Sequence, residues 1–394
     1  MTDPTVECRL VLLLASTRAV REARAGEITG LAARADSPVL LDLLDRLQLS
    51  VLLGRRLREV TGGFDPWLEE QLVERTLAAR GNGEAQEMVA LGILASLSRA
   101  GIRALVLKGV VLARQLYGDA GARTSADIDI LVSAADLAQA IEVVGVMGWR
   151  RREPTSASSQ LPILHEELVH PTLPMVELHW RVHWYETRFA ADLLARAQSP
   201  APHQPLIMEP ADGLATLTLF YARDGFSGLK MAADVATWWD NRCEAADADA
   251  IIAAIATSYP ELAGALWVAT GVLGSLVGLP TNFAGGPLRW QIAAELAGPF
   301  IEPTAAHLGA NASLVDLLLT PRGGRAASLR REVQKVPKGL ERPLTRDDGL
   351  RAYLARSEHV LRVTRRWAMA LALATRRAYR QGAHPQPASA ARWA

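Results

Sequence analysis

The stretch LVLKGVVLARQLYGDAGARTSADIDILV, residues 105–132, decides the fold of this chain. It opens with the apolar run 105–107, which ends at Lys108-Gly109, and residues with helical spacing follow to Tyr117. After a turn rich in glycine, alanine and aspartate, the chain enters a β-branched run that carries Asp127 and Asp129. Short apolar runs bounded by turn residues are typical of strands. The stretch therefore predicts a strand, a turn, a helix, a loop and a second strand.

Asp127 and Asp129 are predicted to point to the same side of their strand. Side chains alternate between the two faces of a strand, so residues two apart share a face. Ile128, Ile130 and Val132 then take the opposite face, as expected of a strand that packs on a core. Two neighbouring carboxylates repel unless a positive charge lies between them, and Mg²⁺ prefers hard oxygen ligands. The pattern indicates a divalent-cation site; the alternative is a solvated strand end with two surface acids.

Lys108 and Gly109 stand where a strand ends and a helix begins. Free backbone N–H groups and the helix dipole favour an anion at a helix start. Gly109 has no Cβ, so a phosphate can approach the backbone closely, and Lys108 and Arg123 add positive charge. Taken alone, the Lys-Gly pair also fits a plain turn. The order of the parts is more specific than any single part and indicates a site for phosphate and metal.

Together these motifs resemble a known family. The matching positions are Leu107-Lys108-Gly109, Leu116-Tyr117, Arg123 and 127–132. They are similar to a bacterial group of uncharacterised nucleotidyltransferases within the superfamily typified by DNA polymerase β, and some members are encoded beside lasso-peptide maturation enzymes. The superfamily commonly has Gly-Ser at the turn, where this chain has Lys108-Gly109-Val110. The resemblance implies an NTP as donor, expected to be ATP, and Mg²⁺ or Mn²⁺ as cofactor.

The same superfamily implies a third carboxylate on a later strand. The segment PMVELHW, residues 174–180, alternates apolar and polar residues, which places Glu177 and His179 on one face. The narrower group has a similar V-E-L-H-W strand after its D-x-D strand, so Glu177 is the expected third carboxylate. The alternative for Glu177 is an exposed strand residue. We expect His179 to orient a neighbour or simply to pack.

Length and composition bound the class of protein. The chain has 394 residues, is 49% apolar and carries a formal net charge of +1, which allows one large domain or two to three modest ones. The apolar run at 10–15 is too short to span a membrane, and no secretion signal is evident. Cys8 and Cys243 lack metal-ligand spacing, which argues against a disulfide framework or a zinc site. We expect a cytoplasmic protein without a membrane partner.

The sequence predicts an α+β fold in which a small mixed sheet, the nucleotidyltransferase core, lies between largely helical N-terminal and C-terminal regions. Residues 1–100 are predicted to form a helical lead-in subdomain, with a helix start at Asp65-Pro66. The apolar stripe predicted for its last helix consists of Met88, Leu91, Leu94 and Leu97.

The catalytic core is predicted at 101–185. Within it we expect a first strand at 102–107, a helix capped by Ser133, and a hairpin whose turn lies at 171–174. The polar segment 153–160 fits a connector or a lid over the phosphate site.

The remainder is predicted to be a helical domain at 186–320, a basic helical region at 321–380 and a disordered tail at 381–394. Lys230 and Asp234 lie four apart on one helix, so Lys230 either reaches a nucleotide phosphate or pairs with Asp234. The basic region has 16 Lys or Arg against five Asp or Glu. It indicates either a docking surface for nucleic acid or a solvated arginine face.

These observations predict a metal-dependent nucleotidyltransferase that moves a nucleoside monophosphate from an NTP to a peptide or small-molecule acceptor and releases pyrophosphate. The predicted catalytic and metal-binding residues are Asp127, Asp129 and Glu177. The predicted nucleotide-binding residues are Lys108, Gly109, Arg123 and Lys230. The resemblance implies a role in tailoring peptide natural products such as lasso peptides. Two alternatives stay open: a toxin-type nucleotidyltransferase acting on tRNA or protein, and a non-catalytic nucleotide-binding partner in a maturation complex.

Overall fold

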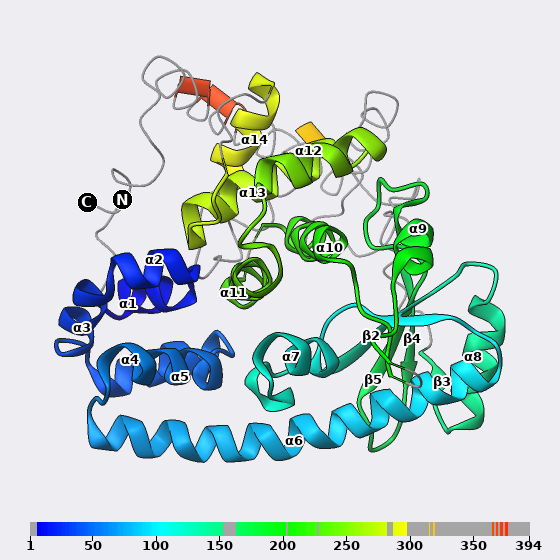
Figure 1. The fold of residues 1–394 in the computed structure, drawn as a ribbon, viewed down its shortest axis with the longest axis horizontal. Coiled ribbons are helices and arrows are strands. Elements are labelled where there is room, and N and C mark those ends of the chain that lie inside the picture. Colours follow the sequence, from blue (N-terminus) through cyan, green and yellow to red (C-terminus); the bar gives the residue numbers. More distant parts are fainter. Residues whose placement is uncertain are drawn as a thin grey trace, which may run out of the picture.

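Helices dominate the protein, and a small five-stranded sheet lies at one end (Figure 1). The computed structural model describes residues 6–152, 163–201, 204–226, 228–281 and 287–297, together with a few isolated residues between 315 and 376. This is the α+β fold that the sequence predicts. Within the described ranges, no helix is long and apolar enough to cross a membrane.

The N-terminal region is helical, as predicted. Its helices are α1 (Val6–Ala15), α2 (Arg18–Ala23), α3 (Ala25–Ala32), α4 (Ser37–Arg46), α5 (Ser50–Thr61) and α6 (Pro66–Arg99). The predicted start of α6 is confirmed, because the Asp65 side chain accepts a hydrogen bond from the Trp67 N–H and Pro66 occupies the first helical position.

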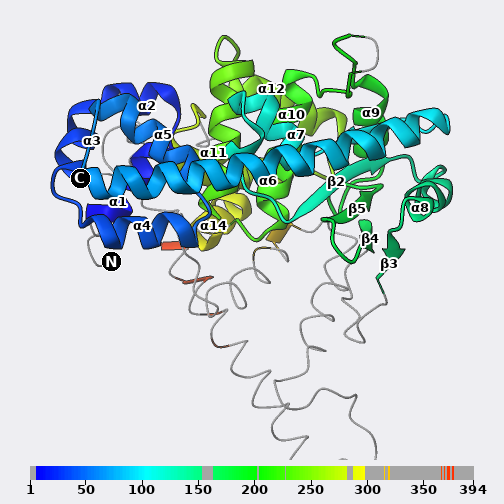
Figure 2. The ribbon, with the colours of Figure 1, turned by 90° about the horizontal axis from the view of Figure 1, so that it is seen from below.

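Helix α6 runs along one side of the molecule, from beneath α4 to the sheet end (Figures 1 and 2). Its face toward the sheet buries Ala90, Ile93 and Leu97. The stripe predicted from the sequence is wrong in part, since Met88 and Leu91 are 69% and 39% exposed. The true stripe includes the small residue Ala90, which hydrophobicity alone does not single out and which lets the helix approach the sheet closely.

Five strands form the sheet in the order β1-β2-β5-β4-β3. They are β1 (Ala104–Val106), β2 (Asp127–Val132), β3 (Arg150–Arg151), β4 (His165–Val169) and β5 (Met175–His179). Only the β2–β5 pair is parallel, and the other three pairs are antiparallel. The predicted hairpin is confirmed as β4 and β5.

Between β1 and β5 the chain forms α7 (Val110–Tyr117), the short 3₁₀ helix η1 (Ala120–Ala122) and α8 (Leu137–Val146). The cap predicted for α8 is wrong, because the helix begins one turn later with Asp136 at the N-cap. Ser133 accepts a hydrogen bond from the Asp136 N–H and donates to the Asp136 carboxylate. The serine therefore closes the turn that leads into the helix.

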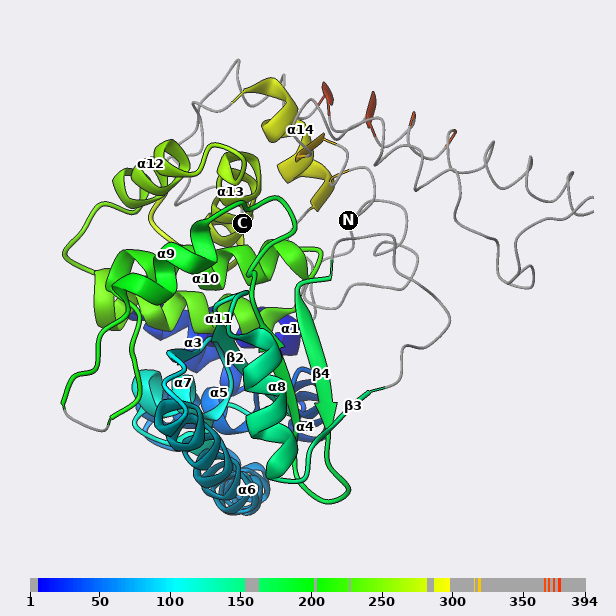
Figure 3. The ribbon, with the colours of Figure 1, turned by 90° about the vertical axis from the view of Figure 1, so that its right-hand side faces the viewer.

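Two hydrophobic cores cover the two faces of the sheet. Ile128, Ile130 and Val132 lie in the core that includes α6 and α8, as the alternation in this strand predicts. Leu131, which points the other way, lies in a larger core shared with Leu105 and most of the other helices. Figure 3 shows α6 nearly end-on, with α8 beside the strands. The carboxylates of β2 therefore point toward the side of the larger helical core.

That larger core joins both ends of the described chain. Its C-terminal members come from α9 (Phe189–Arg196), α10 (Pro210–Arg223), α11 (Leu229–Trp238), the π-helical turn η2 (Trp239–Cys243), α12 (Ala248–Ser258), α13 (Ala263–Val277) and α14 (Leu288–Ala297). Helix α1 contacts α11 and α13, so N-terminal and C-terminal helices pack together. The domain boundaries near 100 and 185 stay predictions.

Three predicted segments fall outside the described residues. They are the connector or lid at 153–160, the basic region at 321–380 apart from isolated positions, and the tail at 381–394.

Candidate active site

Asp127 and Asp129 lie at the start of β2 and share one face, as the sequence predicts. Asp129 is completely buried, and Asp127 is partly buried. Carboxylate oxygens of Asp127, Asp129 and Glu177 lie within 4.8 Å of one another. The structure thus brings together the three acids that the motifs single out, although Asp129 and Glu177 are far apart in sequence.

The register between β2 and β5 places the third acid. In this parallel pair Asp129 is the direct partner of Glu177, and the flanking Ile128 and Ile130 pair with Val176 and Leu178. The apolar partners on both strands enter the core beneath the sheet. Because side chains alternate strictly, this burial fixes both carboxylates on the opposite face.

Lys108 lies among the acids. Its Nζ is 3.0 Å from Asp129 Oδ1 and 3.6 Å from Asp127 Oδ2. Burial alone would lower the pKa of Lys108, but the surrounding carboxylates raise that pKa above its ordinary value. The ammonium therefore stays charged and neutralises the pair of aspartates. Contact between Lys108 and a triphosphate stays a prediction.

The turn at Gly109 requires glycine. Its backbone has a φ of +87°, in a region that side chains disfavour, and it precedes α7 as the N-cap. As the N-cap residue, Gly109 has no side chain with which to cap the first N–H groups of α7. A Cβ at position 109 would lie 3.4 Å from Ser125 Oγ, and that hydroxyl donates to the Asp127 carboxylate at 2.9 Å. The turn at Gly109 therefore lies next to the Ser125 hydroxyl and, through it, next to Asp127.

His179 links two of the acids. Its Nε2 lies 3.0 Å from Asp129 Oδ1 and 3.1 Å from Glu177 Oε2. Burial alone would lower the pKa of His179, but hydrogen bonds to the two carboxylates raise it above the ordinary value. Burial alone would likewise raise the pKa of Asp129, but Lys108 and His179 hold it well below its usual range. Asp129 is therefore ionised inside the protein, beside Lys108 and His179.

Arg123 lies in a buried ion pair. Its Nε donates to Asp234 Oδ2 at 2.5 Å, and the Tyr117 hydroxyl donates to the other oxygen of Asp234 at 2.7 Å. These contacts connect the segment before β2 with α11. Because the Nε of Arg123 is engaged by Asp234, a role of Arg123 in nucleotide binding stays a prediction.

Lys230 reaches the loop beside the acids. Its Nζ donates to Gln48 Oε1 at 2.6 Å and to the Thr124 carbonyl at 3.0 Å, while Asp234 pairs with Arg123. Burial and the nearby cations, Arg123 foremost, lower the pKa of Lys230 to about 8. Lys230 therefore adds positive charge next to the loop that leads into β2, and its contact with phosphate stays a prediction.

The motif analysis missed His165 and Ser125. His165 is the cross-strand partner of His179 in the β4–β5 hairpin, and their rings lie 4.7 Å apart between centroids. A register counted outward from the predicted turn at 171–174 would place Glu166, not His165, opposite His179, so the spacing alone did not identify His165. Ser125 carries no signal either, since a serine in a loop has many roles.

The carboxylate cluster fits a divalent cation. Asp129 Oδ2 is buried and has no hydrogen-bond partner among the described residues. A buried anionic oxygen without a partner is costly. Three carboxylates within reach of one point form an oxygen donor set of the type that Mg²⁺ and Mn²⁺ prefer. The residues present therefore fit the metal that the resemblance implies.

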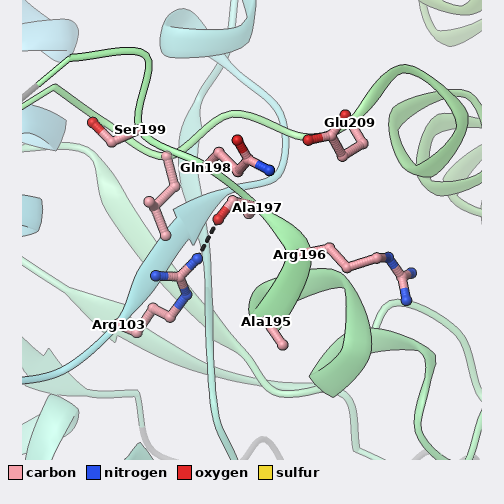
Figure 4. A pocket seen from close by; sticks show the side chains of 8 residues that line it. Arg103, Ala195, Arg196, Ala197, Gln198, Ser199 and Glu209 are labelled. Carbon is pink, nitrogen blue, oxygen red and sulfur yellow. Dashed lines mark hydrogen bonds between the residues drawn. The ribbon is translucent and has the colours of Figure 1, made fainter.

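A pocket also lies away from these acids, between the start of β1 and the end of α9 (Figure 4). Arg103 forms part of its wall and donates to the carbonyls of Leu194 and Ala197. None of the predicted site residues lines this pocket.

Comparison with known proteins identifies the family. No curated protein and no solved structure matches the chain. A family model described as uncharacterised nucleotidyltransferase matches residues 33–274, which include β1 to β5 and all seven predicted site residues. The match covers more than half of the chain, so the chain belongs to this family, whose general activity is nucleotidyl transfer.

Proposed function

We propose that this protein transfers a nucleoside monophosphate from an NTP, with ATP as the expected donor, to a hydroxyl or carboxylate of a peptide or small molecule. Pyrophosphate is the second product. The observation that carries the proposal is that Asp127, Asp129 and Glu177 lie together and that one buried oxygen of Asp129 has no hydrogen-bond partner among the residues that the structure describes. Such a donor set suits a Mg²⁺ or Mn²⁺ ion that also binds phosphate oxygens.

Each residue has a distinct role in the proposed reaction. The acceptor oxygen bonds to the α-phosphorus, and the bond between the α- and β-phosphates breaks. Asp127, Asp129 and Glu177 would hold the divalent ion, which supplies charge neutralisation for the phosphates. Glu177 alternatively takes the proton that the acceptor loses.

The cationic residues and the glycine turn would bind the triphosphate. Gly109 offers an uncapped helix start with no Cβ between the backbone and a phosphate. Lys108 already contacts the acids, and with a divalent ion held by those acids its ammonium would be available to the phosphates. Lys230 and Arg123 would contribute positive charge from the neighbouring loop and helix.

The proposed class of acceptor rests on the family resemblance of the sequence. Peptide tailoring, as in lasso-peptide maturation, is the favoured role, and tRNA or another protein is the alternative acceptor class. A non-catalytic nucleotide-binding role is the remaining candidate, because a fold does not ensure activity.

The proposal is tested by calorimetric titration of each NTP, with Mg²⁺, into the intact protein and into Asp127→Asn and Asp129→Asn variants. Binding of one NTP that requires Mg²⁺ and is lost in both variants is the expected result. Glu142→Gln is the matched control, since this acid is exposed on α8, away from the cluster.

Release of pyrophosphate in the presence of candidate acceptors then separates an enzyme from a nucleotide-binding partner. Metal-dependent binding without turnover on any acceptor class would favour the partner role. Absence of NTP binding to the folded intact protein would overturn the proposal.

A further inference from the structure

The polar face of the sheet extends beyond the three acids. His165 on β4 lies opposite His179 on β5, and Glu177 lies two residues before His179 on the same face. One ligand atom from each of these three residues lies within 4.8 Å of the others. The cluster is partly enclosed, since His179 is completely buried and the side chain of His165 is 27% exposed.

We propose that His165, Glu177 and His179 form a second cation site that takes a transition-metal ion such as Zn²⁺ in preference to Mg²⁺. The site shares Glu177 with the oxygen-only site of Asp127 and Asp129. The inference rests on the proposed function only through that shared residue.

The distances suit such an ion. His179 Nε2 is 3.1 Å from Glu177 Oε2, and His165 Nε2 is 3.9 Å from the same oxygen. For a tetrahedral ion bound at about 2.0–2.1 Å, neighbouring ligand atoms are separated by roughly 3.3–3.4 Å, which lies between these two values. His165 is the ligand that would have to move closer to the ion, because its distance from Glu177 is the longer of the two.

His179 is already oriented toward the proposed site. Its Nε2 faces oxygens of both Asp129 and Glu177 at hydrogen-bond distance. The nitrogen that would bind the ion therefore points at Glu177, the carboxylate that the two sites share. The Asp129 carboxylate keeps a second oxygen that is buried and has no partner within the described part of the chain.

The donor atoms set the preference between the two sites. Two imidazole nitrogens with one carboxylate are typical of Zn²⁺ and similar ions, while Mg²⁺ prefers oxygen ligands only. Three protein ligands leave the fourth position of a tetrahedral ion for water or substrate. The sheet thus offers a hard-ion site and a softer-ion site that share one carboxylate.

The test is calorimetric titration of Zn²⁺, without nucleotide, into metal-free protein. The substitution His165→Ala removes a proposed ligand and should weaken Zn²⁺ binding by at least ~10-fold. Even the loss of a residue that only supports a metal ligand typically weakens metal affinity by about that factor. Asp127→Asn should leave Zn²⁺ binding in place. His170→Ala is the control, because this ring accepts hydrogen bonds from the β4–β5 turn and lies outside the cluster.

A Co²⁺ absorption spectrum gives a second readout, since nitrogen ligation and low coordination change the visible band. The band should be present in the intact protein and lost in His165→Asn, which retains a polar side chain and guards against misfolding of the alanine variant. Zn²⁺ binding that is equal in the intact protein and the folded His165 variants would overturn the inference.

The outcomes also separate this inference from the proposed function. Zn²⁺ binding that depends on His165, with no NTP binding, leaves the second site standing and removes the proposed function. If NTP binds with Mg²⁺ but Zn²⁺ binding does not depend on His165, the proposed function stands and the second site is removed.

Discussion

Arg123 and Asp234 form a buried ion pair, in which Nε of Arg123 lies 2.5 Å from Oδ2 of Asp234 and the side chains are 5% and 1% exposed. The pair connects the segment that precedes the D-x-D strand with helix α11. Tyr117 adds a hydrogen bond to the same carboxylate. The three residues thus fix the position of the loop leading into β2.

Asp234→Ala should lower the free energy of unfolding by about 3–5 kcal/mol, because it leaves the guanidinium of Arg123 buried without a counter-charge. The measurement is denaturant-induced unfolding. Asp42→Ala is the control, since Asp42 pairs with Arg46 on an exposed helix face and should cost no more than ~0.5 kcal/mol. Equal losses in the two variants would contradict a special role of the buried pair.

Gly83→Ala should destabilise the protein by about 1–3 kcal/mol, because a Cβ on Gly83 would lie 2.6 Å from backbone atoms of Ala120 and Gly121. Gly81→Ala should instead stabilise by ~0.5–1 kcal/mol, since its Cβ would meet nothing within 4 Å and alanine favours a helix. Thermal unfolding of both variants checks the opposite signs. Two stabilising substitutions would show that α6 does not pack closely on η1.

His183 should make stability depend on pH. Burial, followed by the nearby Arg223, lowers its pKa to about 3, whereas histidine in an unfolded chain titrates near about 6.5. Between these values only the unfolded state binds the proton, so the contribution is complete above about pH 6.5 and is lost as the pH falls. From pH 6.5 to 5 the loss is about 2 kcal/mol.

The measurement for His183 is denaturant unfolding at a series of pH values in the intact protein and in His183→Gln. The variant should lose less stability on acidification. His170→Gln, on the exposed β4–β5 turn, should keep the slope of the intact protein. Parallel curves for the intact protein and His183→Gln would show that another group causes the acid sensitivity.

Lys108→Met should make stability depend more strongly on Mg²⁺. Without the ammonium, the two aspartates lose the cation that contacts both of them and only His179 still bonds to Asp129, so the cost without metal is of the order of 3 kcal/mol. Added Mg²⁺ should then raise the melting temperature of the variant more than that of the intact protein. Arg114→Met is the control, since Arg114 pairs with Glu87 on the surface. An unchanged response to Mg²⁺ would argue against a cation site between these aspartates.

Local sequence patterns were enough to predict features that depend on a single strand or a single turn. The shared face of Asp127 and Asp129 follows from alternation. Gly109 was singled out because it lacks a Cβ, and its positive φ became visible only in the structure. The fold class followed from the motifs and the family resemblance. Membership of the nucleotidyltransferase family is confirmed by the matched residues.

Pairing between distant segments was beyond these patterns. Lys108 contacts the aspartates because β1 pairs antiparallel with β2, so that the residue after β1 lies beside the start of β2. The ion pair of Arg123 joins positions 111 residues apart, and no periodicity reports such a contact. His165 became visible only with the register of the hairpin.

The parallel pairing of β2 with β5 has a consequence for how the protein is made. Asp129 and Glu177 become neighbours only when β5 pairs with β2, after the chain has crossed over through α8 and β4. Closing such a long loop has a large entropic cost, and contacts of this kind slow folding. A chain emerging from the ribosome carries its D-x-D strand well before the third carboxylate arrives. The cluster of three carboxylates is therefore completed only when β5 joins β2.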